Sequence, residues 1–144
     1  MCAFLGIIAM ARFGKLLYPT EQSEFEIQSY VYTGLRQLGF DVRGEVSSSN
    51  AKSRFDLVVF VDKRPVLIIE TKRTAESMVR GIPKEDRRIH LRKIARDQNK
   101  QLDKYLSYGV PVAWVNGSAD AARLVNIVAD GGLDAVASVC AASI

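Results

Sequence analysis

Two apolar segments joined by a short polar turn constrain the fold of this chain more than any other feature of its sequence. The segments Phe55–Val61 and Val66–Lys72 are rich in Val, Ile and Leu, which is typical of buried strands. Pro65 opens the second segment, and proline is tolerated at the first residue of a strand. The pattern therefore predicts a central β-hairpin.

Charged side chains lie at the ends of both predicted strands. Asp56 lies near the start of the first strand, and Glu70 and Lys72 end the second. These charges need partners, because burial of an unpaired charge is very costly. Side chains alternate along a strand, so Glu70 and Lys72 project from one face, about 6.5 Å apart. Two carboxylates can hold a hard cation such as Mg²⁺, and a lysine beside them can orient a water or stabilise charge on a phosphate.

The register of the hairpin decides whether Asp56 and Glu70 can reach one cation. A two-residue loop at Lys63-Arg64 would set Leu57 against Glu70 and turn Asp56 to the other face. Directly opposed residues share a face, so a three-residue loop or a one-residue β-bulge would bring Asp56 and Glu70 together. We therefore expect an odd loop or a bulge. Four apolar side chains should then lie on the same face beneath a helix: Val58, Phe60, Val66 and Ile68.

A first amphipathic helix is predicted after residue 20, with Thr20 or Ser23 as its cap. Its apolar stripe recurs at helical spacing, and Gly39 ends it. The stripe consists of Ile27, Val31, Leu35 and Leu38. Glu24 begins the same stripe, so its carboxylate either points inward or complements the helix dipole. Glu21 is the alternative candidate for the inward position.

Three further strands and one long helix are expected in the rest of the chain. The strands are predicted at Asp41–Val46, Val110–Asn116 and Arg123–Val128. Pro83 suits the first turn of a helix, and Lys84–Ser107 then contains neither Gly nor Pro. The domain is expected to span residues 20–128, between an N-terminal arm at 1–19 and a tail of unassigned structure at 129–144.

The long predicted helix carries most of the positive charge. The segment from Lys72 to Lys104 has eleven basic and five acidic residues, although the net charge of the whole chain is only +4. A basic segment next to a candidate metal site suits a polyanionic substrate, while a solvated helix face is the alternative interpretation. The candidate phosphate-contacting residues are Arg88, Arg92, Arg96 and Lys100.

Two spaced motifs resemble those of a known group of enzymes. The order Asp56, thirteen residues, Glu70-Thr71-Lys72 resembles the PD-(D/E)xK nuclease superfamily, and more narrowly the N-terminal nuclease domain of type I restriction enzyme motor subunits. Arg54-Phe55-Asp56 stands where those domains carry Pro-Asp. Gln101-Leu-Asp-Lys-Tyr105 resembles the Gln-x-x-x-Tyr motif that several nuclease families of this fold carry after Glu-x-Lys.

The resemblance implies an α/β fold of restriction-endonuclease-like type, in which a mixed central β-sheet is flanked by α-helices. It implies an endodeoxyribonuclease that hydrolyses phosphodiester bonds with Mg²⁺, for which Mn²⁺ would substitute. Asp56, Glu70 and the Thr71 carbonyl would be metal ligands, and Glu24 would be an additional acidic group at the metal site.

The remaining motif residues would act on the substrate. Lys72 would position the attacking water or stabilise the transition state, and Gln101 with Tyr105 would orient the DNA. Two alternatives stay open: a nucleic-acid-binding module without turnover, and a nuclease subunit that is active only with a partner motor protein. A homodimer is a further possibility.

The expected compartment is the cytoplasm. Cys2 and Cys140 are too few to form a disulfide framework. The apolar stretch at residues 1–9 is far too short to span a bilayer, so no membrane association is expected.

Overall fold

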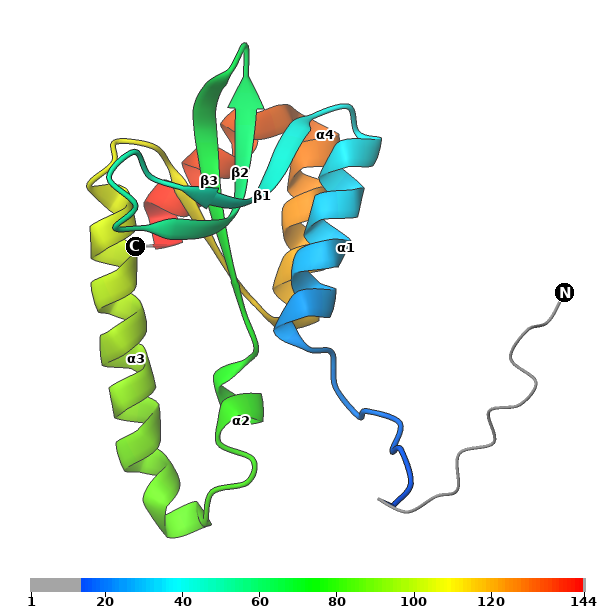
Figure 1. Ribbon diagram of the computed structural model, residues 1–144, viewed down its shortest axis with the longest axis vertical. Helices are drawn as coiled ribbons and strands as arrows, with labels where there is room; N and C mark the ends of the chain where they lie inside the picture. Colours follow the sequence, from blue (N-terminus) through cyan, green and yellow to red (C-terminus); the bar gives the residue numbers. More distant parts are fainter. Residues whose placement is uncertain (1–13, 144) are drawn as a thin grey trace, which may run out of the picture.

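The computed structural model describes residues 14–143, with side chains through residue 138. A four-stranded mixed sheet lies between two layers of helices (Figure 1), which confirms the predicted α/β architecture. The strands, in sheet order, are β1 (Asp41–Ser47), β2 (Arg54–Val61), β3 (Arg64–Lys72) and β4 (Val112–Asn116). The first three are antiparallel in succession, and β4 runs parallel to β3. The helices are α1 (Glu24–Gln37), α2 (Ala75–Met78), α3 (Lys84–Leu106) and α4 (Gly117–Ser143).

Both faces of the sheet are buried, each in its own apolar cluster. Residues Leu57, Val59, Leu67 and Ile69 pack with α1 and α4 on one face. On the other face, Val58 and Ile68 pack with Phe55, Val112 and Tyr105 of α3. Because side chains alternate along a strand, covering both faces requires uninterrupted apolar runs in β2 and β3. The continuous hydrophobic character of the hairpin therefore follows from its central place in the sheet.

The β2–β3 hairpin contains the predicted β-bulge. The turn consists of two residues, Asp62 and Lys63. Both have positive φ (51° and 65°), as a type I′ hairpin turn requires. The register shifts between Val59 and Phe60, so that Val58 lies opposite Ile68. Continued by two residues, the same register places Asp56 opposite Glu70.

One detail of the predicted hairpin is wrong. Phe60 pairs with Pro65, and Val66 is the extra residue of the bulge. The insertion turns the Val66 side chain toward the cluster beneath α1 and α4. Val58, Phe60 and Ile68 lie on the α3 face, as expected.

The last predicted strand is also wrong, because Arg123–Val128 lies within α4. Buried Ala121, Leu124 and Val128 follow helical spacing and pack against the sheet. A short run of apolar residues satisfies both the strand and the helix period, and only the neighbouring elements decide between them. The helix continues past residue 128 to a kink at Gly132, whose φ of 73° and ψ of −171° are not helical, and Val136 beyond the kink is buried in the same cluster.

Helix α1 begins and ends where its sequence predicts. The Ser23 hydroxyl accepts a hydrogen bond from the Glu26 N–H (3.2 Å), and Gly39 with φ of +94° follows its last turn. Of the predicted stripe, Ile27, Val31 and Leu35 are buried, whereas Leu38 is exposed.

Helix α3 is attached to the domain by only part of its length. Tyr105, near its C-terminal end, is its one buried residue. The N-terminal half of the helix projects beyond the sheet, in the same direction as the single turn α2 (Figure 1). Along the helix, Ile94, Gln98 and Leu102 are half-buried and Tyr105 is buried, whereas Leu91 and Ala95 are exposed.

The ends of the chain are described only in part. Residues 14–19 of the predicted arm form neither helix nor strand. Cys2 and the Cys140 side chain lie outside the described residues. Among the helices described, none combines the length and the apolar character needed to cross a bilayer.

A first prediction concerns Gly117, which joins β4 to α4 with φ of +85°. A Cβ atom there would lie 2.6 Å from Cγ2 of Thr74. Thr74 cannot rotate freely, because its hydroxyl caps α2 by accepting from the Ser77 N–H (3.2 Å). Gly117→Ala should therefore lower the free energy of unfolding by about 2–3 kcal/mol.

Gly39→Ala is the matched control, because Gly39 also has positive φ but no atom lies within 4 Å of the position that an added Cβ would take. It should cost only about 1 kcal/mol. Urea denaturation of both variants measures the difference. Equal losses would show that α2 does not press against the start of α4.

Candidate functional site

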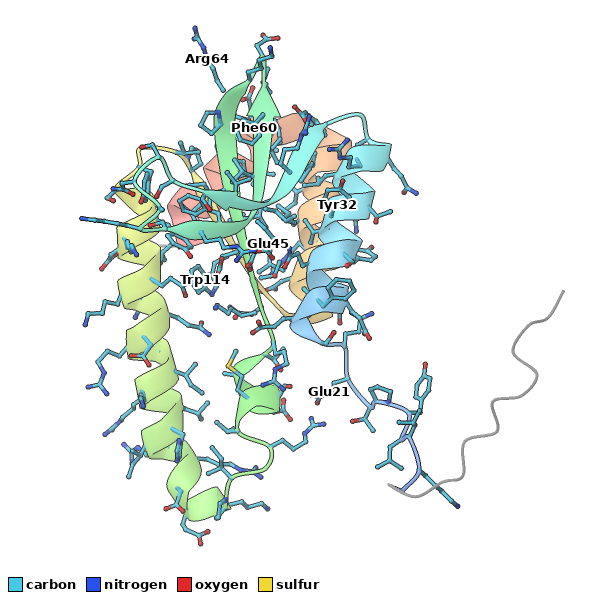
Figure 2. The ribbon with its side chains drawn as sticks, in the orientation of Figure 1. Glu21, Tyr32, Glu45, Phe60, Arg64 and Trp114 are labelled. Atoms are coloured by element: carbon cyan, nitrogen blue, oxygen red, sulfur yellow. The ribbon has the colours of Figure 1, made fainter. Side chains whose placement is uncertain are left out.

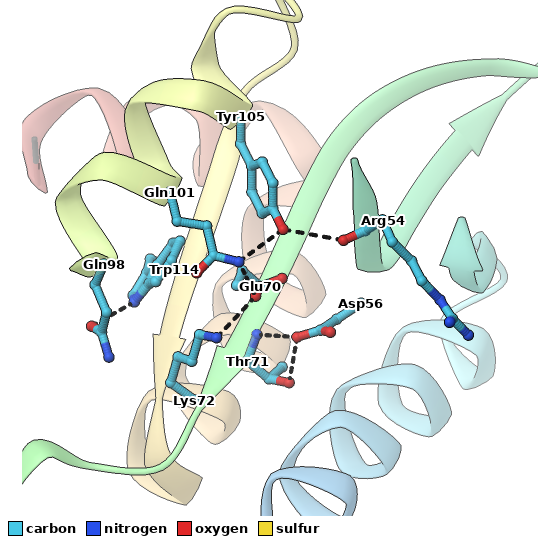
Figure 3. Close-up of polar contacts among 9 residues, drawn as sticks. All are labelled: Arg54, Asp56, Glu70, Thr71, Lys72, Gln98, Gln101, Tyr105 and Trp114. Atoms are coloured by element: carbon cyan, nitrogen blue, oxygen red, sulfur yellow. Dashed lines mark hydrogen bonds and ion pairs between the residues drawn. The ribbon is translucent and has the colours of Figure 1, made fainter. Parts of the chain in front are cut away.

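Six of the residues singled out in the sequence converge at the C-terminal end of β3 (Figure 3). They come from three elements. Strand β2 contributes Asp56, strand β3 contributes Glu70, Thr71 and Lys72, and helix α3 contributes Gln101 and Tyr105. The bulge in the hairpin sets the register of β2 against β3, and packing of Tyr105 on Phe55 anchors α3 across them, with ring centroids 4.8 Å apart.

Asp56 is fixed by the strand that faces it. Its Oδ2 atom accepts hydrogen bonds from the Thr71 N–H (2.9 Å) and from the Thr71 hydroxyl (3.1 Å). The Thr71 side chain is buried. Two donors on one oxygen fix the orientation of the carboxylate. Thr71 thus orients Asp56 through its N–H and hydroxyl, a role that the sequence did not predict.

Glu70 is the most unusual residue of the site, because its carboxylate is almost completely buried (residue exposure 3%). Oε2 accepts a hydrogen bond from the Gln101 side-chain amide (3.2 Å) and lies 3.3 Å from Lys72 Nζ. Oε1 is buried and has no hydrogen-bond partner among the described residues. Buried polar atoms are nearly always paired, so an unpaired carboxylate oxygen is unusual, and it could accept a hydrogen bond or bind a cation.

The electrostatics of Glu70 point the same way. Burial, and then the nearby Asp56 carboxylate, raise the pKa of Glu70 from 4.5 to about 7, against the opposing effect of Lys72. Two carboxylates are therefore held close together in a site that disfavours their shared negative charge. A bound cation would relieve both the repulsion and the cost of burial.

Gln101 and Tyr105 form a chain of hydrogen bonds that supports Glu70. The Gln101 amide donates to Glu70 and also to the Tyr105 hydroxyl (2.9 Å), which donates to the Arg54 carbonyl (3.1 Å). Burial raises the pKa of Tyr105, so its hydroxyl keeps its proton. The Gln-x-x-x-Tyr pair therefore connects α3 to both strands that carry the carboxylates.

The structure does not bring Glu24 into this cluster. Glu24 is exposed at the first turn of α1, and no group of three or more His, Cys, Asp or Glu residues in the described chain could share a metal ion. The residue of α1 that reaches the site is Gln28, whose amide donates to the Asp56 carbonyl (3.2 Å). Glu21, which lies on the segment before α1 (Figure 2), forms an ion pair with Arg80.

Gln28, Gln98 and Trp114 are site residues that sequence reasoning missed. The Trp114 indole N–H donates to the side-chain Oε1 atom of Gln98 (3.2 Å), and the Lys72 Nζ atom lies 5.9 Å from the centre of the indole ring. Gln28 lies one turn beyond Glu24 on the same helix face, which was a usable signal. The sequence carries no comparable signal for Trp114, because only the parallel pairing of β3 and β4 places it beside Glu70.

The basic residues are exposed along α3. None of the four candidates forms an ion pair with the described residues. They are Arg88, Arg92, Arg96 and Lys100. The first three lie N-terminal to Gln98 and Gln101, on the projecting half of the helix.

The donor set suits a small hard cation. Such a cation takes oxygen ligands, and Asp56 and Glu70 supply carboxylate oxygens from adjacent strands. The partnerless Glu70 Oε1 is the atom that a cation would satisfy.

Comparisons with known proteins identify no relative. No protein family, no curated protein and no solved structure matches this chain.

A second prediction follows from the raised pKa of Glu70. Between about 4.5 and about 7 the folded protein retains a proton that the unfolded chain has lost. The free energy of unfolding of the metal-free protein should therefore fall as pH rises through this window. Glu70→Gln removes this dependence and should gain about 3 kcal/mol relative to the wild type between about pH 4 and about pH 8.

Urea denaturation across the pH range measures the effect. Glu26→Gln, the same change at an exposed glutamate, is the control and should leave the pH profile unchanged. Parallel profiles for the wild type and Glu70→Gln would show that Glu70 titrates normally.

Proposed function

We propose that this protein is a metal-dependent endodeoxyribonuclease of the PD-(D/E)xK type, with a restriction-endonuclease-like fold, that hydrolyses phosphodiester bonds of DNA in the cytoplasm. The observation that carries the proposal is the convergence of two carboxylates, a lysine and a Gln–Tyr pair from β2, β3 and α3. A chance hairpin with three charges would not also place Gln101 within hydrogen-bond distance of Glu70. The order of the residues along the chain matches the superfamily motifs.

Each residue then has a definite role in the reaction. Asp56 and Glu70 would hold Mg²⁺, or Mn²⁺ in its place, and the ion would polarise the scissile phosphate and lower the pKa of a bound water. Thr71 keeps Asp56 oriented, and Gln101 keeps Glu70 oriented. The Lys72 ammonium, whose side chain is 22% exposed, can reach the attacking water or the charge that develops on the phosphate.

The shape of the domain favours a long polyanion as substrate. The basic half of α3 extends away from the carboxylate site (Figure 1), and its exposed arginines would attract a polyanion to this part of the domain. Arg88, Arg92, Arg96 and Lys100 would contact phosphates, the groups that take most protein–DNA hydrogen bonds and carry no sequence information.

A second function, a nucleic-acid-binding module without turnover, is favoured by one observation. Only two carboxylates meet in the described site, and Lys72 already neutralises one of them at 3.3 Å. In that case Lys72 would be a permanent structural partner of Glu70, and the fold would serve DNA binding alone. The two functions differ in whether metal binds and cleavage occurs.

A third prediction tests the carboxylates. Asp56→Asn and Glu70→Gln, which keep side-chain size, should each lower cleavage of supercoiled plasmid in Mg²⁺ or Mn²⁺ by about 100-fold or more, because each removes a charged metal ligand. Binding of DNA in EDTA should change little. The readout is the rate of nicked and linear product formation.

Glu26→Gln serves as the control and should cleave like the wild type. Wild-type cleavage by the Glu70→Gln protein would show that the site is misassigned. A wild-type protein that binds DNA but neither binds Mn²⁺ nor cleaves would establish the binding module. Cleavage only after addition of a motor subunit would indicate a partner-dependent nuclease.

A fourth prediction tests the basic helix. Changing Arg88, Arg92 and Arg96 together to Gln should weaken binding to every DNA sequence and reduce the slope of log K against log salt by about 2–3, because each phosphate contact releases counterions. Fluorescence anisotropy at several salt concentrations measures the slope.

The matched control removes three exposed arginines elsewhere, at Arg43, Arg64 and Arg123. Arg64 lies at the tip of the hairpin, far from α3 (Figure 2). An equal reduction of the slope in both triple variants would mean that net charge, and not the α3 surface, governs binding.

A further inference from the structure

The Lys72 ammonium has two partners at once. It lies 3.3 Å from Glu70 Oε2 and 5.9 Å from the centre of the Trp114 ring. The second contact is a cation–π interaction, in which the negative face of an indole attracts a positive charge. The two partners lie side by side, because the parallel register of β3 and β4 pairs Glu70 with Trp114 (Figure 3).

The indole is held in place independently of Lys72. Its N–H donates to Gln98 on α3 (3.2 Å), and the ring packs against the apolar cluster beneath that helix. A tryptophan in a cluster needs a partner for its N–H, and a hydrogen bond from its edge fixes the orientation of its face. The face therefore remains turned toward Lys72 whatever the state of the carboxylate.

A cation bound at the carboxylates would affect the two partners of Lys72, Glu70 and Trp114, differently. A cation on Glu70 Oε1 would repel the Lys72 ammonium on Oε2 and draw on the negative charge of the same carboxylate, so it would weaken that ion pair. The indole is not a ligand for a hard cation, so it remains available to the ammonium. Without the indole, a lysine freed from Glu70 would have no fixed partner among its described contacts and would lose its position.

We propose that Trp114, locked by Gln98, is the positioning residue for Lys72: it retains the ammonium at the site when Glu70 is engaged by a cation. The catalytic consequence, that Lys72 stays within reach of water or phosphate, rests on the proposed nuclease function. The Lys72–Trp114 contact does not depend on turnover, because a mutation that releases Lys72 from Glu70 tests it without any metal.

The first measurement is NMR of protein labelled with ¹³C-lysine. The Lys72 ε-methylene resonance, assigned by its loss in Lys72→Arg, should be shifted upfield by the indole ring current. The shift should persist in Glu70→Gln, where the ion pair is gone, and in wild type with saturating Mg²⁺. It should disappear in Trp114→Leu, alone or combined with Glu70→Gln, and decrease in Gln98→Ala. Loss of the shift in Glu70→Gln would overturn the proposal.

The second measurement is cleavage. Trp114→Leu should lower kcat by about tenfold with KM within about twofold, since a desolvated cation–π contact is worth roughly that factor. Trp114→Phe, which restores an aromatic face, should recover much of the loss. Trp114→Leu should have no further effect in a Lys72→Ala background, because Trp114 acts through Lys72.

Phe60→Leu is the matched control, because it removes a ring from the same apolar cluster without contacting Lys72. It should leave both the Lys72 resonance and kcat unchanged. An unshifted kcat in Trp114→Leu, or equal losses in Phe60→Leu and Trp114→Leu, would refute the positioning role. A wild type that shows the ring-current shift but no cleavage would refute the nuclease function and leave the Lys72–Trp114 contact standing.

Discussion

The burial of one carboxylate, that of Glu70, is the constraint on which the site depends. A charge with 3% exposure is tolerated only when surrounding groups compensate it. Gln101 and Lys72 both act on Oε2, and Oε1 is left without a partner in the described chain. The remaining strain is visible as a pKa raised to about 7. Burial of such a group costs stability, and strongly perturbed carboxylates of this kind cluster at functional sites.

The hairpin and α3 are the two elements that make this burial possible. The bulge opposite Phe60 shifts the β2–β3 register by one residue and so brings Asp56 to the face of Glu70. Helix α3 then covers the site with its C-terminal half, where Tyr105 packs against Phe55 and donates to the Arg54 carbonyl. Its N-terminal half is free of the sheet and carries the exposed arginines (Figure 1). One helix therefore both supports the carboxylates and carries a row of exposed positive charge.

Local pattern was enough to predict the elements with strong signals. The apolar runs predicted β2 and β3, and the need to bring Asp56 and Glu70 together predicted an odd loop or a bulge, of which the structure contains the bulge. Ser23 and Gly39 marked the ends of α1 through hydrogen bonding and positive φ. The failures were of another kind. The apolar residues of Arg123–Val128 fit the period of a strand and the period of a helix equally well. Val66 lies on the other face of the sheet from the one predicted, because it is the extra residue of the bulge.

The sequence by itself determined the chemistry of this protein: which side chains are acidic, basic or amide, and the order in which they occur. It determined the pairing of neighbouring strands as well, since short turns leave few alternatives. Only the tertiary structure decided which partners those groups have. Contacts such as Trp114 with Lys72, or Gln28 with the Asp56 carbonyl, join residues far apart in the chain. Their distances depend on a parallel crossover and on helix packing, which no local period encodes.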